Sequence, residues 1–181
     1  MAHRDVPTEK RLEDLYELID GIDTVMMTTR RSDGRLVSRA MATQDRAAGA
    51  DLWFVTDISS DKLDELAFDA NVNIAYFRDR TREWVSVSGT ARITQDRAKI
   101  EELYAPDWRI WFGDEGGERN GKPGDPRMAL IAVDADTVVY TKKDASTPVV
   151  LFEMAKAMVT GEPPRETYKT REVSGEEMRR G

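Results

Sequence analysis

The stretch Trp53-Phe-Val-Thr-Asp-Ile-Ser-Ser-Asp-Lys62 decides how the rest of this chain is interpreted. Its apolar and β-branched first half predicts a buried strand over Asp51 to Thr56. The Ser and Asp residues that follow predict a short turn and then a helix that begins near Ser59 or Ser60. A helix start exposes unpaired backbone N–H groups and the positive end of the helix dipole, so it stabilises a bound anion.

Taken alone, this segment allows two interpretations. In the first, the hydroxyls of Thr56, Ser59 and Ser60 and the ammonium of Lys62 hold one phosphate group. In the second, Ser60 caps the helix, Lys62 is a solvated surface lysine, and nothing binds. The rest of the chain has to decide between them.

Composition limits the chemistry that the chain can perform. Its 181 residues favour one domain that buries a core without disulfides. There is no cysteine, and the single histidine is His3, so we set aside thiolate catalysis, Cys- or His-based metal sites, haem ligation and a Ser-His-Asp triad. The net charge of −7 argues against a nucleic-acid partner. No apolar run is as long as a membrane span, and the start lacks a signal-peptide core, so we expect a cytoplasmic protein without a membrane partner.

The predicted elements follow one another mostly through short turns. We expect strands over Thr24 to Thr29, Arg35 to Thr43, Asp51 to Thr56, Val72 to Arg78, Glu83 to Thr94 and Met128 to Thr141. We expect helices from a Thr8 cap to Gly21, from near Ser60, over Asp96 to Tyr104, and over Pro148 to Thr160. Gly89 inside a strand predicts a bulge or a close backbone approach. This order predicts a mainly β protein, an antiparallel barrel with helices packed outside, spanning residues 1–162, with a flexible polar tail over 163–181.

Four motifs in sequence order make the chain resemble the FMN-binding split-barrel family related to pyridoxamine 5′-phosphate oxidase, and within it the general stress protein 26 group. They are the hairpin strand with Gly34, Ser38, Arg39, Ala40 and Met41; the run Phe54 to Lys62; the strand Val85-Ser-Val-Ser-Gly89; and Trp108, Trp111, Phe112 and Gly113 followed by Asp125-Pro126. The resemblance extends from about Leu12 to about Tyr140, which is most of the chain.

The resemblance implies a Greek-key-like split β-barrel, bound FMN, and a homodimer with the cofactor site between subunits. It assigns cofactor contacts to Arg39, Ala40, Met41, Phe54, Val55, Thr56, Ser59, Ser60, Lys62, Trp84, Trp108 and Trp111. Each role has an ordinary alternative. Arg39 is then a strand residue that faces solvent, Met41 fills the core, and Trp84 packs on the barrel. Trp108 and Trp111, three residues apart and so on one helix face, then pack in the core instead of stacking on a ring.

Three departures from the oxidases limit the reaction. Asp61 replaces the Arg of their Ser-Arg-Lys phosphate segment, Trp84 replaces a flavin-contacting Gln, and their Arg- and His-containing C-terminal substrate segment has no counterpart. These departures argue against pyridoxamine phosphate oxidation.

Three functions therefore stay open. The first is an FMN-dependent oxidoreductase with NAD(P)H as a candidate electron donor. The second is a non-catalytic flavin-binding stress or sensor module, and the third is a split-barrel protein that uses a deazaflavin or another ligand. We assign no catalytic residue.

Overall fold

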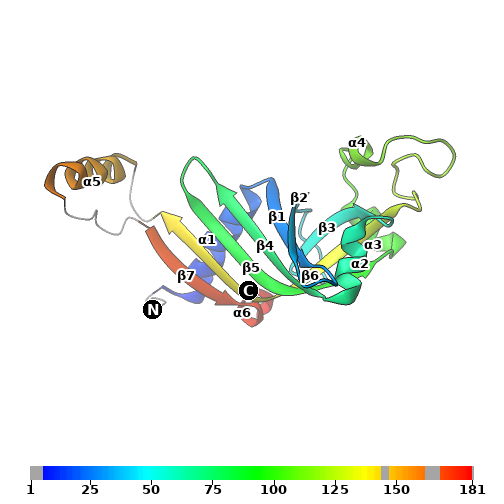
Figure 1. Cartoon of the computed structure of the whole chain (residues 1–181), viewed down its shortest axis with the longest axis horizontal. Helices are drawn as coiled ribbons and strands as arrows, with labels where there is room; N and C mark the ends of the chain where they lie inside the picture. Colours follow the sequence, from blue (N-terminus) through cyan, green and yellow to red (C-terminus); the bar gives the residue numbers. More distant parts are fainter. Residues whose placement is uncertain (1–5, 144–146, 162–167, 181) are drawn as a thin grey trace.

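The computed structural model describes residues 6–143, 147–161 and 168–180. They form a seven-stranded antiparallel sheet in the order β2-β1-β4-β5-β6-β3, with β7 paired to the free stretch of β6 (Figure 1). The strands are β1 (Thr24–Arg30), β2 (Leu36–Ala42), β3 (Leu52–Asp57), β4 (Asn71–Arg78), β5 (Glu83–Thr94), β6 (Met128–Lys143) and β7 (Tyr168–Ser174). The helices are α1 (Thr8–Asp20), α2 (Asp61–Phe68), α3 (Arg97–Leu103), α4 (Trp108–Phe112), α5 (Thr147–Thr160) and α6 (Gly175–Arg180). The predicted mainly β architecture with flanking helices is confirmed.

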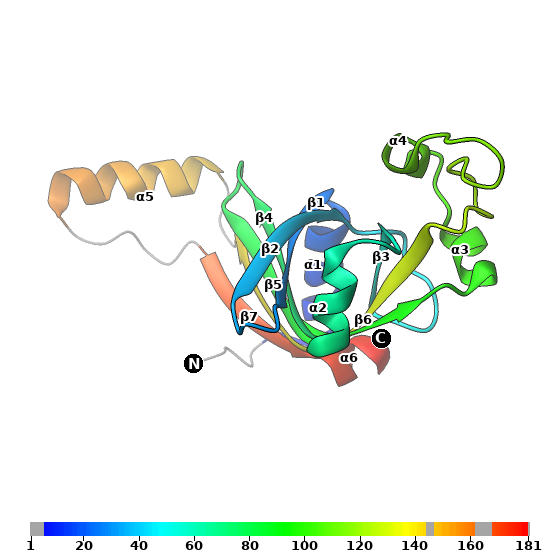
Figure 2. The same ribbon diagram turned by 45° about the vertical axis from the view of Figure 1, so that its right-hand side comes forward.

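The sheet curls into a barrel that is left open between its edge strands, β2 and β3. Just beyond β2, the backbone N–H of Gln44 donates to the carbonyl of Trp53 in β3 at 2.8 Å, but the strands themselves form no ladder. Helix α2 packs against β1 and β5, and in Figure 2 it lies between β2 and β3. The barrel is therefore split, and the split is the place where unpaired strand edges and a helix start come together.

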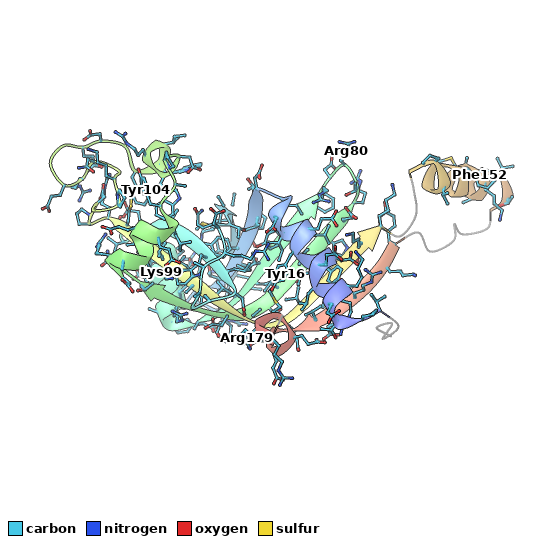
Figure 3. The ribbon with its side chains drawn as sticks, turned by 180° about the vertical axis from the view of Figure 1, so that it is seen from behind. Tyr16, Arg80, Lys99, Tyr104, Phe152 and Arg179 are labelled. Atoms are coloured by element: carbon cyan, nitrogen blue, oxygen red, sulfur yellow. The ribbon has the colours of Figure 1, made fainter. Side chains whose placement is uncertain are left out.

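Two apolar clusters hold the helices to the sheet. The first fills the barrel and includes Leu15 and Leu18 of α1. The second lies under α3 and α4 and includes Trp53 and Trp108. The first half of β6 serves both clusters because alternate residues point to opposite faces, so residues 128–133 are all buried. Figure 3 shows α1 with Tyr16 across the back of the sheet, and α3 at the end away from α5.

The prediction of a flexible tail is wrong for residues 168–180, which form β7 and α6. Strand β7 pairs with β6 from Thr137↔Ser174 to Lys143↔Tyr168, and Val173 and Met178 are buried in the barrel core. The composition is polar because β7 points only alternate residues inward, and one of these, Arg171, is ion-paired with the buried Asp14 of α1. Residues 163–167 and 181 of the expected tail lie outside the described residues.

The start of α1 also differs from the prediction. Pro7, not Thr8, occupies the N-cap position, and the Thr8 hydroxyl donates to Glu177 Oε1 of α6 at 3.4 Å. Arg11 Nη2 donates to the same carboxylate at 2.6 Å. Contacts between the two ends of the described chain therefore replace the local cap.

Gly89 lies at a β-bulge, as predicted. The β5–β6 register shifts between Ser88 and Gly89, and a Cβ on Gly89 would lie 2.3 Å from the carbonyl oxygen of Asp134. The obstacle is backbone, so a side chain here forces the two strands apart.

We expect Gly89→Ala to lower the free energy of unfolding by roughly 1–3 kcal/mol, because the added methyl overpacks the bulge. Urea denaturation followed by tryptophan fluorescence measures the change. Gly124→Ala is the matched control, since a Cβ at Gly124 meets nothing within 4 Å. Equal stability of the two variants would show that the bulge relaxes without strain.

Candidate functional site

A cavity of about 330 Å³ lies at the split of the barrel, where β2, β3, the start of α2 and α4 meet. Its lining residues are Thr24, Ala40, Met41, Ala42, Gln44, Val55, Thr56, Asp57, Lys62, Asp107, Trp108, Trp111 and Phe112. The walls are largely apolar, and Lys62 is the only Lys or Arg among the lining residues. A pocket of this size and character is typical of small-ligand sites.

Lys62 is fixed by two hydroxyls. Its Nζ donates to Thr56 Oγ1 at 2.7 Å and to Ser60 Oγ at 2.6 Å. Ser60 occupies the N-cap position of α2, but its side chain makes no capping hydrogen bond. Ser60 therefore stands at the predicted cap position, but its hydroxyl contacts the Lys62 ammonium at the cavity wall and makes no capping bond to the helix N–H groups.

Among the residues that the structure describes, none is a direct counterion for the charge of Lys62. Across the described residues, no carboxylate oxygen lies within 4.0 Å of its Nζ. Burial lowers the pKa of Lys62, and the nearby positive charge of Arg39 lowers it further, while Asp57, Asp61 and Glu65 act in the opposite direction. A half-buried cation that has only hydroxyl partners favours an anion beside it.

Arg39 is held beside this site but not in the cavity lining. Its Nη1 donates to Thr29 Oγ1 at 2.7 Å and is ion-paired with Glu65 Oε2 at 2.9 Å. The Thr29 hydroxyl donates to the same Glu65 oxygen. That Arg39 contacts the phosphate or the ring stays a prediction. Its guanidinium lies close enough to lower the pKa of Lys62, but it is paired with Glu65, a partner that the sequence did not indicate.

The two tryptophans of α4 line the cavity in different ways. Trp108 is buried, and its Nε1 donates to Gln44 Oε1 at 2.7 Å, whereas Trp111 is 79% exposed. The Gln44 amide is fixed at its other end, where Nε2 donates to the carbonyl of Ala42 at 2.9 Å. Trp108 is thus a rigid wall of the cavity, and Trp111 is an exposed ring at its mouth.

A buried ion pair between Asp125 and Arg127 positions this aromatic wall. Arg127 donates to Asp125 through Nε and Nη2, to the carbonyl of Phe112 at 2.6 Å and to that of Gly113 at 3.1 Å. Hydrogen bonds from Arg127 hold the pKa of Asp125 well below its usual range, and the Gly121 N–H adds to this effect. The pair therefore pins the end of α4 and the following loop to the start of β6.

The remaining predicted residues divide between the cavity and other places. Ala40, Met41, Val55 and Thr56 line it. Phe54 is fully buried in the barrel core, and the Ser59 hydroxyl donates to Asp57 Oδ1 at 2.6 Å. Trp84 lies outside the lining, since it pairs with Phe77 and with Thr141 at the far end of β6 from β3.

Six lining residues were not predicted: Thr24, Ala42, Gln44, Asp57, Asp107 and Phe112. Ala42 follows from Ala40 by strand alternation, and Phe112 belongs to the tryptophan motif itself. Gln44 had no local signal, because its role depends on the chain after β2 crossing to β3.

Neither a membrane span nor a metal cluster is found in the part of the chain that the structure describes. No helix there is long and apolar enough to cross a bilayer. No group of three or more His, Cys, Asp or Glu residues in those ranges could hold a metal ion.

Comparison with known proteins gives consistent results. The family model described as pyridoxamine 5′-phosphate oxidase like matches residues 10–165. Protein bli-3 of Neurospora crassa is 37% identical over 177 residues, which are 96% of this chain and 84% of that protein.

Solved structures share the fold. General stress protein 26 of Bacillus anthracis aligns with a TM-score of 0.61 and 24% identity, over 72% of this chain and 92% of that one. The general stress FMN/FAD binding protein of Xanthomonas citri aligns with a TM-score of 0.57 and 26% identity, over 71% and 87%. A pyridoxamine 5′-phosphate oxidase-related, FMN binding protein of Nostoc punctiforme aligns with a TM-score of 0.60 and 14% identity, over 94% and 98%.

Proposed function

The chain belongs to the pyridoxamine 5′-phosphate oxidase-like family, and from this premise we propose that it binds FMN in the cavity at the split of the barrel. The observation that carries the proposal is the Lys62 ammonium, held by Thr56 and Ser60 and lacking a carboxylate partner within the described chain. The Xanthomonas citri and Nostoc punctiforme proteins are described as flavin-binding, which supports a flavin. The cation supports a flavin that ends in a phosphate.

The lining residues and the adjoining Ser60 divide into a phosphate end and a ring end. Lys62, Ser60 and Thr56 would hold the phosphate, with the positive end of α2 behind them. Met41 and Trp111 would contact the ring, because they supply apolar surface to the same cavity. Trp108 would act through shape alone, since its indole N–H is already bonded to Gln44. The residues present therefore fit FMN in both charge and polarity.

We propose that the protein is an oxidoreductase in which bound FMN carries the electrons or hydride. The chain itself supplies binding and orientation: among the described residues, the only titratable side chains in the lining are Asp57, Lys62 and Asp107. NAD(P)H is the candidate donor. A non-catalytic flavin-binding module is the second candidate, because the C-terminal substrate segment of the oxidases has no counterpart here. Residues 168–180 pack on β6 and α1 and supply no residue to the cavity lining.

FMN titration tests the binding proposal. We expect the protein to take up FMN, with quenching of flavin fluorescence, and Lys62→Ala to weaken binding by at least about 1.5 kcal/mol, the value of one charged hydrogen bond. Lys10→Ala, which removes the same charge from an exposed position on α1, should bind FMN as the unmodified protein does.

Riboflavin separates the phosphate contact from general damage to the site. It lacks the phosphate, so its weaker binding should be the same in the unmodified protein and in Lys62→Ala. No uptake of FMN would refute the proposed function, and equal FMN affinity in the two proteins would place the phosphate elsewhere.

Turnover distinguishes the two candidate functions. For an oxidoreductase, we expect NADH or NADPH to bleach the absorbance of bound FMN, and an added electron acceptor to restore it repeatedly. Stopped-flow absorbance measures both steps. FMN that stays oxidised with either nucleotide, although it is bound, would favour the non-catalytic module.

We also propose that the protein is a homodimer with the cavity at the subunit interface. Strand register places Met26, Ala40, Ala75 and Phe77 on the outer face of β1, β2 and β4, where Met26 is 42% exposed and Phe77 is 53% exposed. Ala40 also lines the cavity, so the cavity opens onto this apolar face. Trp84, paired with Phe77 on the same face, would then approach the partner and not its own cavity.

Phe77→Glu should convert the dimer to a monomer, because it places a charge on the proposed interface. Light scattering coupled to size-exclusion chromatography measures the mass. Phe68→Glu is the matched control, since Phe68 is similarly exposed at 58% but lies at the end of α2. A monomeric unmodified protein, or a Phe77→Glu protein that stays dimeric, would contradict this interface.

A further inference from the structure

A second cavity of about 430 Å³ lies beside the first, between β2 and α2. Asp61 lines it and is adjacent in sequence to Lys62 of the first cavity. Arg39 lines it and is two residues before Met41 on the same face of β2. We call it the α2 cavity. A ligand whose phosphate sat at Lys62 and whose chain continued from Met41 toward Arg39 along β2 would therefore face the residues of the α2 cavity.

The charge of the α2 cavity differs from that of the first. Asp61, Asp64 and Glu65 supply three carboxylates, and Arg31 and Arg39 supply two guanidinium groups. Both guanidinium groups are engaged: Arg39 with Glu65 at 2.9 Å, and Arg31 with Asp33 at 3.7 Å. In the part of the chain that the structure describes, no Lys or Arg nitrogen lies within 4.0 Å of the carboxylates of Asp61 or Asp64.

The hold on Arg39 is firm. Its Nη1 contacts both the Glu65 carboxylate and the hydroxyl of Thr29, whose side chain is buried, and Thr29 also donates to Glu65. An anion in the α2 cavity would have to compete with Glu65 for Arg39 while facing Asp61 and Asp64. Lys62 makes the proposed phosphate position in the first cavity cationic. The excess of carboxylates in the α2 cavity repels a further anion.

We propose that Asp61, Asp64 and Glu65 make the site selective for a flavin mononucleotide and exclude the dinucleotide. This inference rests on the proposed FMN function. FMN ends at the phosphate that Lys62 would hold, whereas FAD continues through a second phosphate to adenosine, and the acidic α2 cavity opposes that second phosphate. When selectivity comes from repelling the wrong ligand, the same charges also weaken binding of the right ligand. Asp61, directly beside Lys62, would weaken FMN binding in this way.

The experiment measures Kd for FMN and for FAD by flavin fluorescence, on the unmodified protein and on Asp61→Asn/Asp64→Asn. We expect the unmodified protein to prefer FMN, and the double variant to lose on the order of fivefold of that preference, mainly through tighter FAD binding. The preference of the unmodified protein should also shrink as salt is raised, because the charges involved are solvent-accessible. A steric barrier would not respond to salt.

Glu9→Gln/Glu101→Gln is the matched control, since it removes two exposed carboxylates from α1 and α3 and should leave the FMN-to-FAD ratio unchanged. If circular dichroism shows that the double variant folds poorly, Asp64→Asn alone replaces it, with about half the expected change in the FMN-to-FAD affinity ratio. Equal affinity of the unmodified protein for the two flavins, or an unchanged ratio in Asp64→Asn, overturns the selectivity but leaves the FMN function standing. Failure to bind either flavin overturns both.

Discussion

Strand β6 pairs with β5 on one side, and on its other side it pairs first with β3 and then with β7. The rest of the structure depends on the bulge at which this change of partner occurs. Strand β6 pairs with β5 along its length, with β3 over residues 128–133 and with β7 over residues 137–143. The β5–β6 bulge falls between these two stretches, where Gly89 lets the Asp134 backbone approach. Asp51 Oδ2 accepts the Ala135 N–H at 2.8 Å and also binds Arg179 of α6 at 2.8 Å. One carboxylate therefore satisfies the backbone that the bulge leaves unpaired and ties the last helix to it.

The position of the cavity follows from this arrangement. Because β3 pairs only with the first half of β6, it ends beside the start of that strand, and α2 begins four residues later. Because β2 and β3 do not pair, the sheet is open where β3 ends, and α2 and α4 contribute the other walls. The Asp125–Arg127 pair sits directly before β6 and holds α4 by its C-terminal carbonyls. Backbone edges, a helix start and an aromatic wall are thus brought together by a single strand and its two flanks.

Local patterns in the sequence predicted most of the elements, because alternation, helical spacing and turn chemistry act over a few residues. The strands that became β1 and β2, the Gly89 bulge and the strand that leads to α2 were all predicted this way. The errors came from interactions between distant residues. Arg171 and Val173 were predicted to lie in a flexible tail because their partners, Asp14 and strand β6, are distant in sequence. Thr8 was predicted to cap α1 because its actual partner, Glu177, lies near the other end of the chain. Trp84 needed the register to place it at the far end of β6.

The cavity residues show the same limit in electrostatic terms. Ser60 and Lys62 are two apart, and their sequence allowed either a capped helix or an anion site. The two interpretations differ in whether the Ser60 hydroxyl contacts the helix N–H groups or the Lys62 ammonium. The position of that ammonium depends in turn on its hydrogen bond to Thr56 of β3. Burial and Arg39 both lower the pKa of Lys62, so the free site holds a cation that the surroundings only partly stabilise. In a chain of net charge −7, such a cation would normally attract one of the many carboxylates. Thr56 and Ser60 fix it in place without neutralising it, and an anion that enters the cavity meets donors already arranged to bind it.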